Sequence, residues 1–320
     1  MERIAKISMP ELKIFSGRSH RALATAIAET IERELGKCDI ENFSDGEIWV
    51  KYNSNIRGDD VFIVQSTNPP AENLMELLIM IDAAKRASAR RVTAVIPYFG
   101  YGRQDRKDQP RVSITAKLVA NLITEAGADR VITMDLHAPQ IQGFFDIPVD
   151  HLYSSAVFMP FLRKFIIPNL AVVSPDVGGI KLARAYAKRL DSELILIDKR
   201  RPKPNIAEVM NIIGDVHEKN ILIVDDLIDT GGTFTNAVEA LKNAGANDVY
   251  GACAHAVLSG AAVKKVEQSS VKKLFVTDTF PTRIVCEKIE ALTVAKIFGE
   301  AILRCYNNES ISTLFDIDKG

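Results

Sequence analysis

Three aspartates and two glycines lie close together in the stretch VDDLIDTGGT, which runs from Val224 to Thr233. The aliphatic run that leads into it, from Ile221, predicts a strand, and the FTNAVEAL that follows it predicts a helix. Glycines in such a turn let the backbone come close to a ligand. N–H groups at the start of a helix, at the positive end of its dipole, favour a phosphate. The stretch therefore predicts a phosphate-binding loop flanked by carboxylates.

The carboxylates themselves cannot bind the phosphate, but they accept strong hydrogen bonds from hydroxyl groups. A diol next to a phosphate is a ribose phosphate. We therefore expect Asp225 and Asp226 to hold the 2- and 3-hydroxyls, directly or through a metal, and residues 229–233 to hold the 5-phosphate. The alternative is an ordinary turn with Asp229 or Thr230 as helix N-cap. The predicted ribose 5-phosphate residues are Asp225, Asp226, Asp229, Thr230, Gly231, Gly232 and Thr233.

A second candidate is the long loop PYFGYGRQDRKDQPRVSITAK, which carries five cationic side chains from Arg103 to Lys117. Aromatic residues stand at its base. Cations combined with aromatic rings suit a polyphosphate attached to a purine. A solvated charged loop is an equally good interpretation of this pattern alone.

Polar residues also follow other predicted strands. In MDLHA, Asp135 and His137 are two residues apart, which predicts one face, and His137 could ligate the metal of Mg²⁺-ATP or contact its phosphates. Asp176 of SPDVGG could hold a second Mg²⁺. The cations Lys199 to Arg201 of LIDKRRP suit charge stabilisation beside a polyphosphate, although a surface turn is the common alternative.

Alternating strand and helix patterns predict an α/β fold with mostly parallel sheets covered on both faces. In such sheets ligands bind at the carboxyl ends of the strands, where these motifs lie. The 320 residues suggest about two domains. EAGADRVITMDLHA and NAGANDVYGACAHA share an offset of 118 (245 minus 127), and FSGRSHRALATAIA pairs with SPDVGGIKLARAYA. We predict two similar domains, 1–155 and 156–320, although Ala-Gly-Ala before a strand is a common junction.

Bulk properties limit the classes of protein. The net charge of −1 disfavours a nucleic-acid partner. The four cysteines are far apart and form no CxxC pair, which is typical of reduced thiols in a cytoplasmic protein. We expect neither a signal peptide nor a membrane-spanning segment.

Six segments in order resemble the ribose-phosphate pyrophosphokinases of the phosphate-activated class, over nearly the whole chain. These are NFSDGE, YGRQDRK, DLHAPQIQGFFDIPVDHL, SPDVGG, DKRRPKPNIAEVMNIIGDV and DDLIDTGGT. The resemblance implies two phosphoribosyltransferase-like domains. It also implies transfer of the β,γ-diphosphoryl group of ATP to the 1-hydroxyl of ribose 5-phosphate. The products, 5-phosphoribosyl 1-diphosphate and AMP, would serve nucleotide biosynthesis, with two Mg²⁺ ions assisting.

The resemblance assigns a role to each matching position. Implied ATP-binding residues are Phe43, Asp45, Gly46 and Glu47, from a neighbouring subunit, with Arg103, Gln104, Asp108 and His137. Implied metal ligands are His137 and Asp176, and implied catalytic residues are Lys199 and Arg201. A regulatory site for phosphate and ADP, between subunits of a homohexamer, matches Arg57, Ser88, Arg111, Ser310 and Ser312. One departure is that Val177 and Gly178 stand where some family members carry histidine.

Three other functions remain open. A phosphoribosyltransferase has the same ribose-binding motif, but is typically shorter and lacks YGRQDR and DKRRP. A catalytically silent relative is expected to lose the lysine of DKRRP, which is intact here. A DNA-binding regulator would need a helix-turn-helix extension and a basic patch, and neither is evident.

Overall fold

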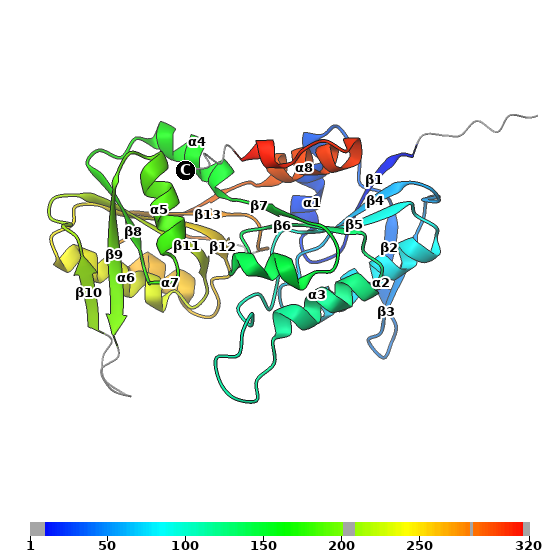
Figure 1. Cartoon of the computed structure of the whole chain (residues 1–320), viewed down its shortest axis with the longest axis horizontal. Helices are drawn as coiled ribbons and strands as arrows, with labels where there is room; N and C mark the ends of the chain where they lie inside the picture. Colours follow the sequence, from blue (N-terminus) through cyan, green and yellow to red (C-terminus); the bar gives the residue numbers. More distant parts are fainter. Residues whose placement is uncertain (1–9, 201–208, 282–283, 316–320) are drawn as a thin grey trace, which may run out of the picture. The chain divides into compact units, whose positions relative to one another are not determined.

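The computed structural model describes residues 10–200, 209–281 and 284–315, without the side chains of residues 199, 200, 209 and 210 (Figure 1). The chain divides into two compact units. The first comprises residues 1–152 and 295–320, and the second comprises residues 153–294. Each unit has its own sheet and its own buried core. Within the described ranges, every helix is too short or too polar to span a bilayer.

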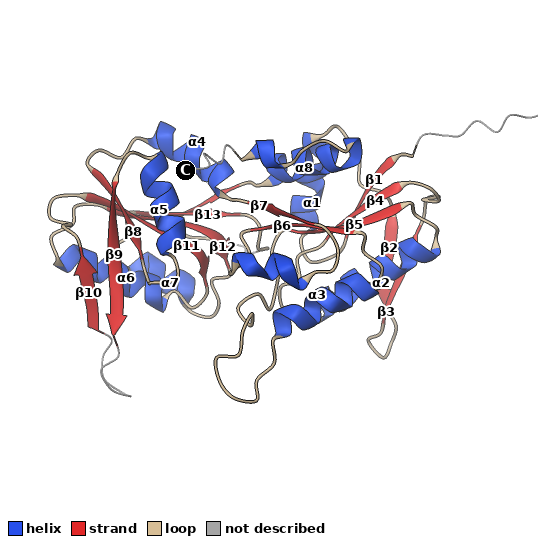
Figure 2. Cartoon of the chain, viewed as in Figure 1, coloured by secondary structure: helices blue, strands red, loops and turns tan. Residues whose placement is uncertain are grey.

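The first unit contains a five-stranded sheet in the order β1-β4-β5-β6-β7, and every neighbouring pair is parallel (Figure 2). Its strands are β1 (Leu12–Ser16), β4 (Asp60–Val64), β5 (Arg91–Ile96), β6 (Arg130–Met134) and β7 (Val149–Leu152). All residues of β4 are buried. Continuous burial explains why these strands read as apolar runs, since a parallel sheet is covered on both faces.

Four helices cover this sheet: α1 (Arg21–Thr30), α2 (Glu72–Arg86), α3 (Thr115–Glu125) and α8 (Ala295–Asn307). Helices α2 and α3 bury residues such as Leu77 and Val119 in a core with Ile63 of the sheet. Figure 2 shows α1 and α8 on the opposite face. Two short 3₁₀ segments, Pro139–Phe144 and Ser312–Leu314, complete the unit.

The place of α8 differs from the predicted domain division, which assigned residues 295–320 to the C-terminal domain. The structure places them in the first unit. A Cβ on Gly299 would lie 2.2 Å from Oγ1 of Thr30, so the lack of a side chain lets α8 pack closely on α1. The Tyr306 hydroxyl donates to the carbonyl of Pro10 (2.7 Å), which holds the end of α8 beside β1.

An antiparallel hairpin of β2 (Cys38–Asn42) and β3 (Ile48–Tyr52) also belongs to the first unit. The ring of Tyr52 meets the ring of Phe15 edge to face, with centroids 4.6 Å apart. Its hydroxyl donates to the carbonyl of Met80 (2.8 Å). These contacts fix the base of the hairpin on α2 and β1 and leave its turn, residues 43–47, in solvent.

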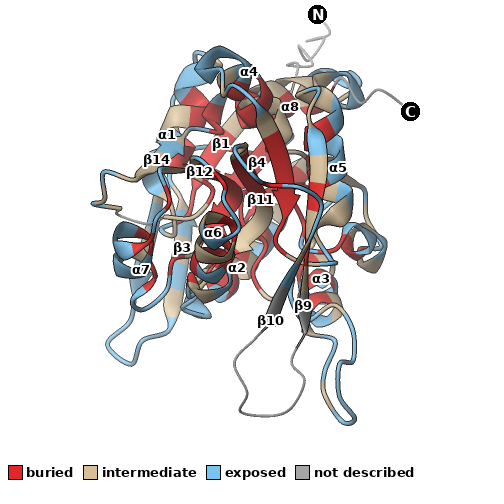
Figure 3. Ribbon diagram, turned by 90° about the vertical axis from the view of Figure 1, so that its left-hand side faces the viewer, coloured by how far each residue is buried: buried red, intermediate tan, exposed pale blue. Residues whose placement is uncertain are grey.

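The second unit contains a seven-stranded sheet in the order β10-β9-β8-β11-β12-β13-β14, parallel except for β10 against β9. The strands are β8 (Leu170–Ser174), β9 (Glu193–Arg200), β10 (Val209–Ile213), β11 (Asn220–Ile228), β12 (Val249–Ala256), β13 (Lys273–Thr277) and β14 (Ile289–Leu292). The helices are α4 (Ser155–Phe165), α5 (Ile180–Arg189), α6 (Gly232–Asn243) and α7 (Ala262–Gln268). One core includes residues of α6 and α7 and another includes residues of α4 and α5, so the central strands are buried (Figure 3).

The two units share one strand order. Ile14 of β1 pairs with Phe62 of β4 on one edge, and an isolated parallel bridge joins Ile14 to Leu35 on the other. The order Leu35-β1-β4-β5-β6-β7 therefore matches β9-β8-β11-β12-β13-β14, which confirms the predicted α/β fold with two similar domains.

The repeat with an offset of 118 is a wrong alignment of these units. It pairs β6 with β12, but the strand order makes β13 the counterpart of β6. The error has a physical origin, because Ala-Gly-Ala before a valine suits any junction from helix to strand. The other pair, SGRSH with SPDVGG, is consistent with the structure, since each segment follows the first strand of its unit.

Candidate active site

The strand order of the second unit reverses between β8 and β11. The chain runs from β8 to β9 on one side and continues from β11 to β12 on the other. Ligands of open α/β sheets bind at such a reversal, at the carboxyl ends of the strands. Asp176 follows β8, and Asp225 and Asp226 lie in the last part of the adjacent β11. The structure therefore brings together two motifs that are about fifty residues apart in the sequence.

The acids at this reversal influence one another. The half-buried Asp225 carboxylate accepts the backbone N–H of Asp226 at 2.9 Å. Burial raises the pKa of Asp225 well above its ordinary value, and the carboxylates of Asp226 and Asp176 raise it further. Donors or cations would relieve this repulsion, and the hydroxyls of a sugar or a divalent cation are suitable partners.

A magnesium ion fits this donor chemistry in only one way. Among the described residues, no group of three or more His, Cys, Asp or Glu side chains is arranged to hold a metal. Mg²⁺ commonly takes about one or two carboxylates from the protein and its other ligands from water and substrate phosphates. The acids of the second unit fit that shared mode and do not form a complete protein site.

The predicted phosphate-binding loop, residues 229–231 (here called the phosphate loop), joins β11 to α6. Strand β11 ends at Ile228, and α6 begins at Gly232 with Gly231 as its N-cap, at a φ of 74°. The interpretation of Asp229 or Thr230 as N-cap is therefore wrong. The hydroxyl of Thr235 donates to the carbonyl of Gly231 (3.0 Å), so it serves the backbone of the loop. Thr230 and Thr233 are exposed and leave their hydroxyls accessible.

Two residues beside this loop were not predicted from the sequence. The hydroxyl of Ser259 donates to Oδ1 of Asp229, and Nζ of Lys265 donates to the carbonyl of Thr230 (3.0 Å). Both come from the segment after β12, LSGAAVKK. Its Ser-Gly turn before a helix is the same kind of signal as in the predicted sites, and it could have identified them.

Of the two predicted catalytic cations, Lys199 lies near the end of β9, the neighbour of β8. Lys199 pairs with Met210 of β10 in the antiparallel register. Because β9 and β8 are parallel, the carboxyl end of β9 lies at the same edge of the sheet as Asp176. The side chain of Lys199 and the whole of Arg201 lie outside the described part of the chain.

In the first unit, the cationic loop begins at the end of β5. Its start is fixed by Thr67, whose backbone N–H donates to the carbonyl of Tyr98 (3.0 Å) and whose Oγ1 accepts from Gly100 (2.8 Å). Further along, the Thr115 hydroxyl donates to Oε1 of Gln104 at 2.6 Å, which ties that side chain to the start of α3.

The loop passes beside the segment that follows β6. A Cβ on Gly102 would lie 3.8 Å from Cβ of His137, and the amide of Gln140 donates to Asp105 (3.1 Å). The structure thus brings Arg103 and Gln104 near His137, and all three are exposed. Asp108 is exposed further along the loop.

The alternation that predicted one face for Asp135 and His137 does not apply. Strand β6 ends at Met134, before both residues. Asp135 is buried with a φ of 35°, whereas His137 is exposed. A backbone that leaves the strand conformation no longer places every second side chain on one face.

The turn of the β2–β3 hairpin carries the predicted adenine-binding residues. The ring of Phe43 is 56% exposed, and Gly46 adopts a φ of 99° in the turn. The Asp45 carboxylate accepts the N–H of Glu47 at 3.1 Å. The exposed part of this ring is accessible to a ligand or to another copy of the chain.

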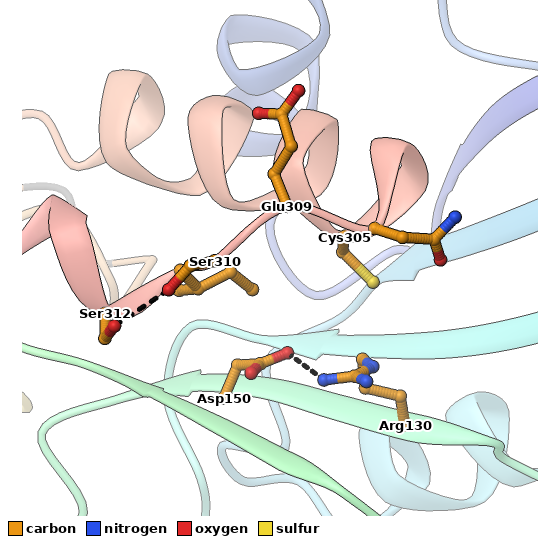
Figure 4. Close-up of a pocket in the computed structure, with 8 residues that line it drawn as sticks. Arg130, Asp150, Cys305, Glu309, Ser310 and Ser312 are labelled. Carbon is orange, nitrogen blue, oxygen red and sulfur yellow. Dashed lines mark hydrogen bonds and ion pairs between the residues drawn. The ribbon is translucent and has the colours of Figure 1, made fainter.

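Four of the five predicted regulatory residues lie at the amino ends of the strands of the first unit. Ser310 and Ser312 share a hydrogen bond (2.8 Å) and line a pocket of about 430 Å³ with the ion pair of Arg130 and Asp150 (Figure 4). Arg57 and Ser88 are neighbours in a turn where the N–H of Gly58 donates to the carbonyl of Ser88 (2.9 Å). Arg111 differs, because its loop starts at the carboxyl end of β5.

The fold and the arrangement of the acids beside a phosphate loop define an α/β protein with phosphoribosyltransferase-like units. The N-terminal domain of ribose phosphate pyrophosphokinase matches residues 12–127, and a phosphoribosyl synthetase-associated domain matches residues 197–316. A ribose-phosphate pyrophosphokinase of Chlorobaculum tepidum is 61% identical over 307 residues, 95% of each chain. One of Bacillus caldolyticus is 53% identical over 309 residues, 96% of this chain and 98% of that protein.

A solved structure is also similar. Phosphoribosylpyrophosphate synthetase from Mycobacterium smegmatis matches with a TM-score of 0.89 and 38% identity, over 93% of this chain and 99% of that one. The chain therefore belongs to the ribose-phosphate pyrophosphokinase family, a family of diphosphokinase enzymes.

Proposed function

We propose that this enzyme transfers the β,γ-diphosphoryl group of ATP to the 1-hydroxyl of ribose 5-phosphate, giving 5-phosphoribosyl 1-diphosphate and AMP. The observation that carries the proposal is the acid pair Asp225–Asp226 directly before a phosphate loop, at the strand-order reversal of the second unit. Family membership over nearly the whole chain supports it.

Each unit has its own part in this proposal. In the second unit, Asp225 and Asp226 accept the sugar hydroxyls, while the N–H groups of residues 229–233 bind the 5-phosphate. In the first unit, Arg103, Gln104 and His137 bind ATP, with Asp108 nearby. Phe43, Asp45, Gly46 and Glu47 of the exposed turn contact the adenine of an ATP bound to a neighbouring subunit.

In this reaction the protein has mainly to position the reactants and neutralise charge. The 1-hydroxyl oxygen attacks the β-phosphorus and releases its proton to water, the bond from that phosphorus to the α-phosphate oxygen breaks, and AMP leaves with that oxygen. Lys199 and Arg201 compensate the charge that develops on the bridging oxygen. His137 of the first unit and Asp176 of the second would each hold a Mg²⁺ ion, and these ions would supply charge neutralisation at the phosphates.

Regulation is a second part of the proposal. Phosphate activates and ADP inhibits through a site that includes Arg57, Ser88, Ser310 and Ser312 of one subunit. Arg111 lies at the other end of the sheet in its own unit, so another subunit of a hexamer supplies it. The four free cysteines suit the cytoplasm, where thiols stay reduced.

Incubation with ATP, Mg²⁺ and ribose 5-phosphate, followed by chromatography, tests the activity directly. We expect AMP to appear in proportion to consumed ribose 5-phosphate. A phosphoribosyltransferase would instead need no ATP. It would join a base to the phosphoribosyl group of 5-phosphoribosyl 1-diphosphate and release diphosphate. Rates measured across phosphate and ADP concentrations test the regulation, and a flat response to both would contradict it.

A further inference from the structure

Three consecutive carbonyl groups, one from the last residue of β11 and two from the phosphate loop, are bound by one other segment, residues 258–265. The N–H of Leu258 donates to the carbonyl of Ile228 (3.0 Å), and the N–H of Ser259 donates to that of Asp229 (2.9 Å). Nζ of Lys265 donates to the carbonyl of Thr230 (3.0 Å). The first two donors are backbone groups, so only the third depends on the identity of a side chain.

These bonds determine which way the loop presents its N–H groups. A trans peptide is planar, and its C=O and N–H point in opposite directions. Because the carbonyls of residues 228–230 face residues 258–265, the N–H groups of Asp229, Thr230 and Gly231 face away from that segment. Successive N–H groups on one side of a turn form a concavity that binds anions. The first N–H groups of α6 extend it.

Of these three peptides, the one between Thr230 and Gly231 depends most on a hydrogen bond that fixes its orientation. Gly231 has a φ of 74°, and glycine adopts positive and negative φ about equally readily. Rotation of this peptide would therefore meet little intrinsic resistance, and it would turn the Gly231 N–H out of the concavity. Helix α7 lies against this glycine, since a Cβ on Gly231 would be 3.4 Å from Cα of Ala262.

We propose that Lys265 is a positioning residue for the 5-phosphate: its ammonium group holds the Thr230–Gly231 peptide with the Gly231 N–H directed at the phosphate. This inference rests on the proposed function, because it assigns the loop to ribose 5-phosphate. It adds a residue from α7 to a site that the sequence motif confines to β11 and α6. Lys265 acts through the backbone of the loop and does not take part in the chemical step.

The test compares Lys265→Met and Lys265→Arg with the matched control Lys264→Met. Lys264 is the preceding residue on α7 and is also exposed. Loss of one directed N–H donor to a phosphate should raise KM for ribose 5-phosphate roughly tenfold in Lys265→Met. We expect unchanged kcat at saturating sugar phosphate, unchanged KM for ATP, and wild-type behaviour of the control. Lys265→Arg retains a cationic donor and should restore most of the affinity.

The dependence of binding on salt concentration distinguishes a positioning role of Lys265 from direct electrostatic attraction between its ammonium group and the phosphate. Attraction between exposed charges weakens strongly as ionic strength rises, whereas a restraint on a peptide orientation persists. Titration calorimetry with ribose 5-phosphate gives the affinity of wild type divided by that of Lys265→Met. This ratio should be similar at about 0.05 M and about 0.5 M salt. A ratio that falls to one at high salt would overturn the positioning role. A crystal structure of Lys265→Met should show the Thr230–Gly231 peptide rotated.

The inference and the proposed function fail separately. If wild-type protein forms no AMP and binds no ribose 5-phosphate, the proposed function is wrong. If wild type is active and Lys265→Met matches Lys264→Met in KM and affinity, only the role of Lys265 is wrong.

Discussion

The carboxylate of Asp225 accepts the backbone N–H of the adjacent Asp226 at 2.9 Å, in the last part of β11. The two acids are close enough for the charge of Asp226 to affect the pKa of Asp225. Burial is the largest cause of the raised pKa of Asp225, followed by the charge of Asp226. Such an arrangement costs stability in the free protein. It is useful only if a ligand with hydroxyl groups or a cation meets the acids.

Asp225→Asn should therefore weaken substrate binding and stabilise the free protein. The amide keeps the shape of the side chain but loses charge-assisted bonds to the sugar, so KM for ribose 5-phosphate should rise at least about tenfold. Steady-state kinetics at saturating ATP measures this change. An unchanged KM would refute the assignment of Asp225 to the sugar hydroxyls.

The stability gain should depend on pH in a defined direction. A carboxyl group with a raised pKa in the folded state costs nothing below its unfolded pKa of about 4, where both states are protonated. As pH rises, the unfolded state ionises first, and the free energy of unfolding falls until the folded pKa is passed. Urea denaturation without Mg²⁺ should show little difference between wild type and Asp225→Asn near pH 4 and a clear advantage of the variant at pH 7–8.

Lys199→Ala should lower kcat by orders of magnitude, about 10²-fold or more, with a modest change in KM. A cation that compensates charge only in the transition state contributes to kcat and not to ground-state binding. Lys188→Ala, at an exposed position in the last turn of α5, is the control and should retain wild-type rates. Near-normal kcat in Lys199→Ala would remove this residue from the chemistry.

The sequence predicted best what depends on short stretches of chain. Apolar runs that end in Asp, Gly or Thr indicated both the parallel sheets and the sites at their carboxyl ends, because burial and loop chemistry are local properties. The place of α8 was not predictable in this way, since Gly299 matters only through its approach to Thr30 on a helix far away in the sequence. The Ser-Gly turn of LSGAAVKK indicates a site near Lys265, but the contact of Lys265 was not predictable, because its partner is a backbone carbonyl group, which every residue has.

Arg18→Met should loosen the β2–β3 hairpin and weaken ATP binding. Glu76 is 1% exposed and accepts from both Nε and the backbone N–H of Arg18 at 2.5 Å. The same guanidinium donates to Asn42 at 2.6 Å, and Asn42 donates to the carbonyl of Gly46 at 2.8 Å. Arg18 thus connects the buried Glu76 to the turn that carries the predicted adenine contacts.

We expect hydrogen exchange in residues 38–52 to become faster in Arg18→Met and KM for ATP to rise several-fold, with KM for ribose 5-phosphate unchanged. The free energy of unfolding should fall by about 1–3 kcal/mol, since a buried carboxylate loses its charged donor. Arg33→Met, at another exposed arginine, is the control. Equal hydrogen exchange in the hairpin of Arg18→Met and wild type would contradict this positioning role.

Asp60→Asn should be the most destabilising of these substitutions in the first unit. Asp60 is 1% exposed at the start of β4 and accepts from Nε of Arg90 (2.8 Å) and from Nε of Arg91 (3.1 Å). Arg91 also donates to Asn308 (2.9 Å), beyond the end of α8. The substitution replaces the carboxylate by a neutral amide with only one acceptor oxygen, so the two guanidinium groups lose their shared counter-charge and the contact between sheet and helix loosens. The expected loss is about 2–4 kcal/mol, below that of a fully buried pair because both arginines are partly exposed.

The pH dependence of this loss follows from the pKa of Asp60. Burial acts to raise it, but the hydrogen bonds and charges of Arg90 and Arg91 together outweigh burial and lower it. A lowered pKa stabilises the folded state above the unfolded pKa of about 4, and this contribution disappears as pH falls through the folded value. The difference between wild type and Asp60→Asn in urea denaturation should therefore be constant from pH 6 to 8 and shrink below about pH 4. Asp82→Asn is the control, because it breaks the exposed ion pair with Arg86, and it should lower the free energy of unfolding by only about 0.3 kcal/mol. An equally small loss in Asp60→Asn would show that the buried carboxylate does not organise this end of the sheet.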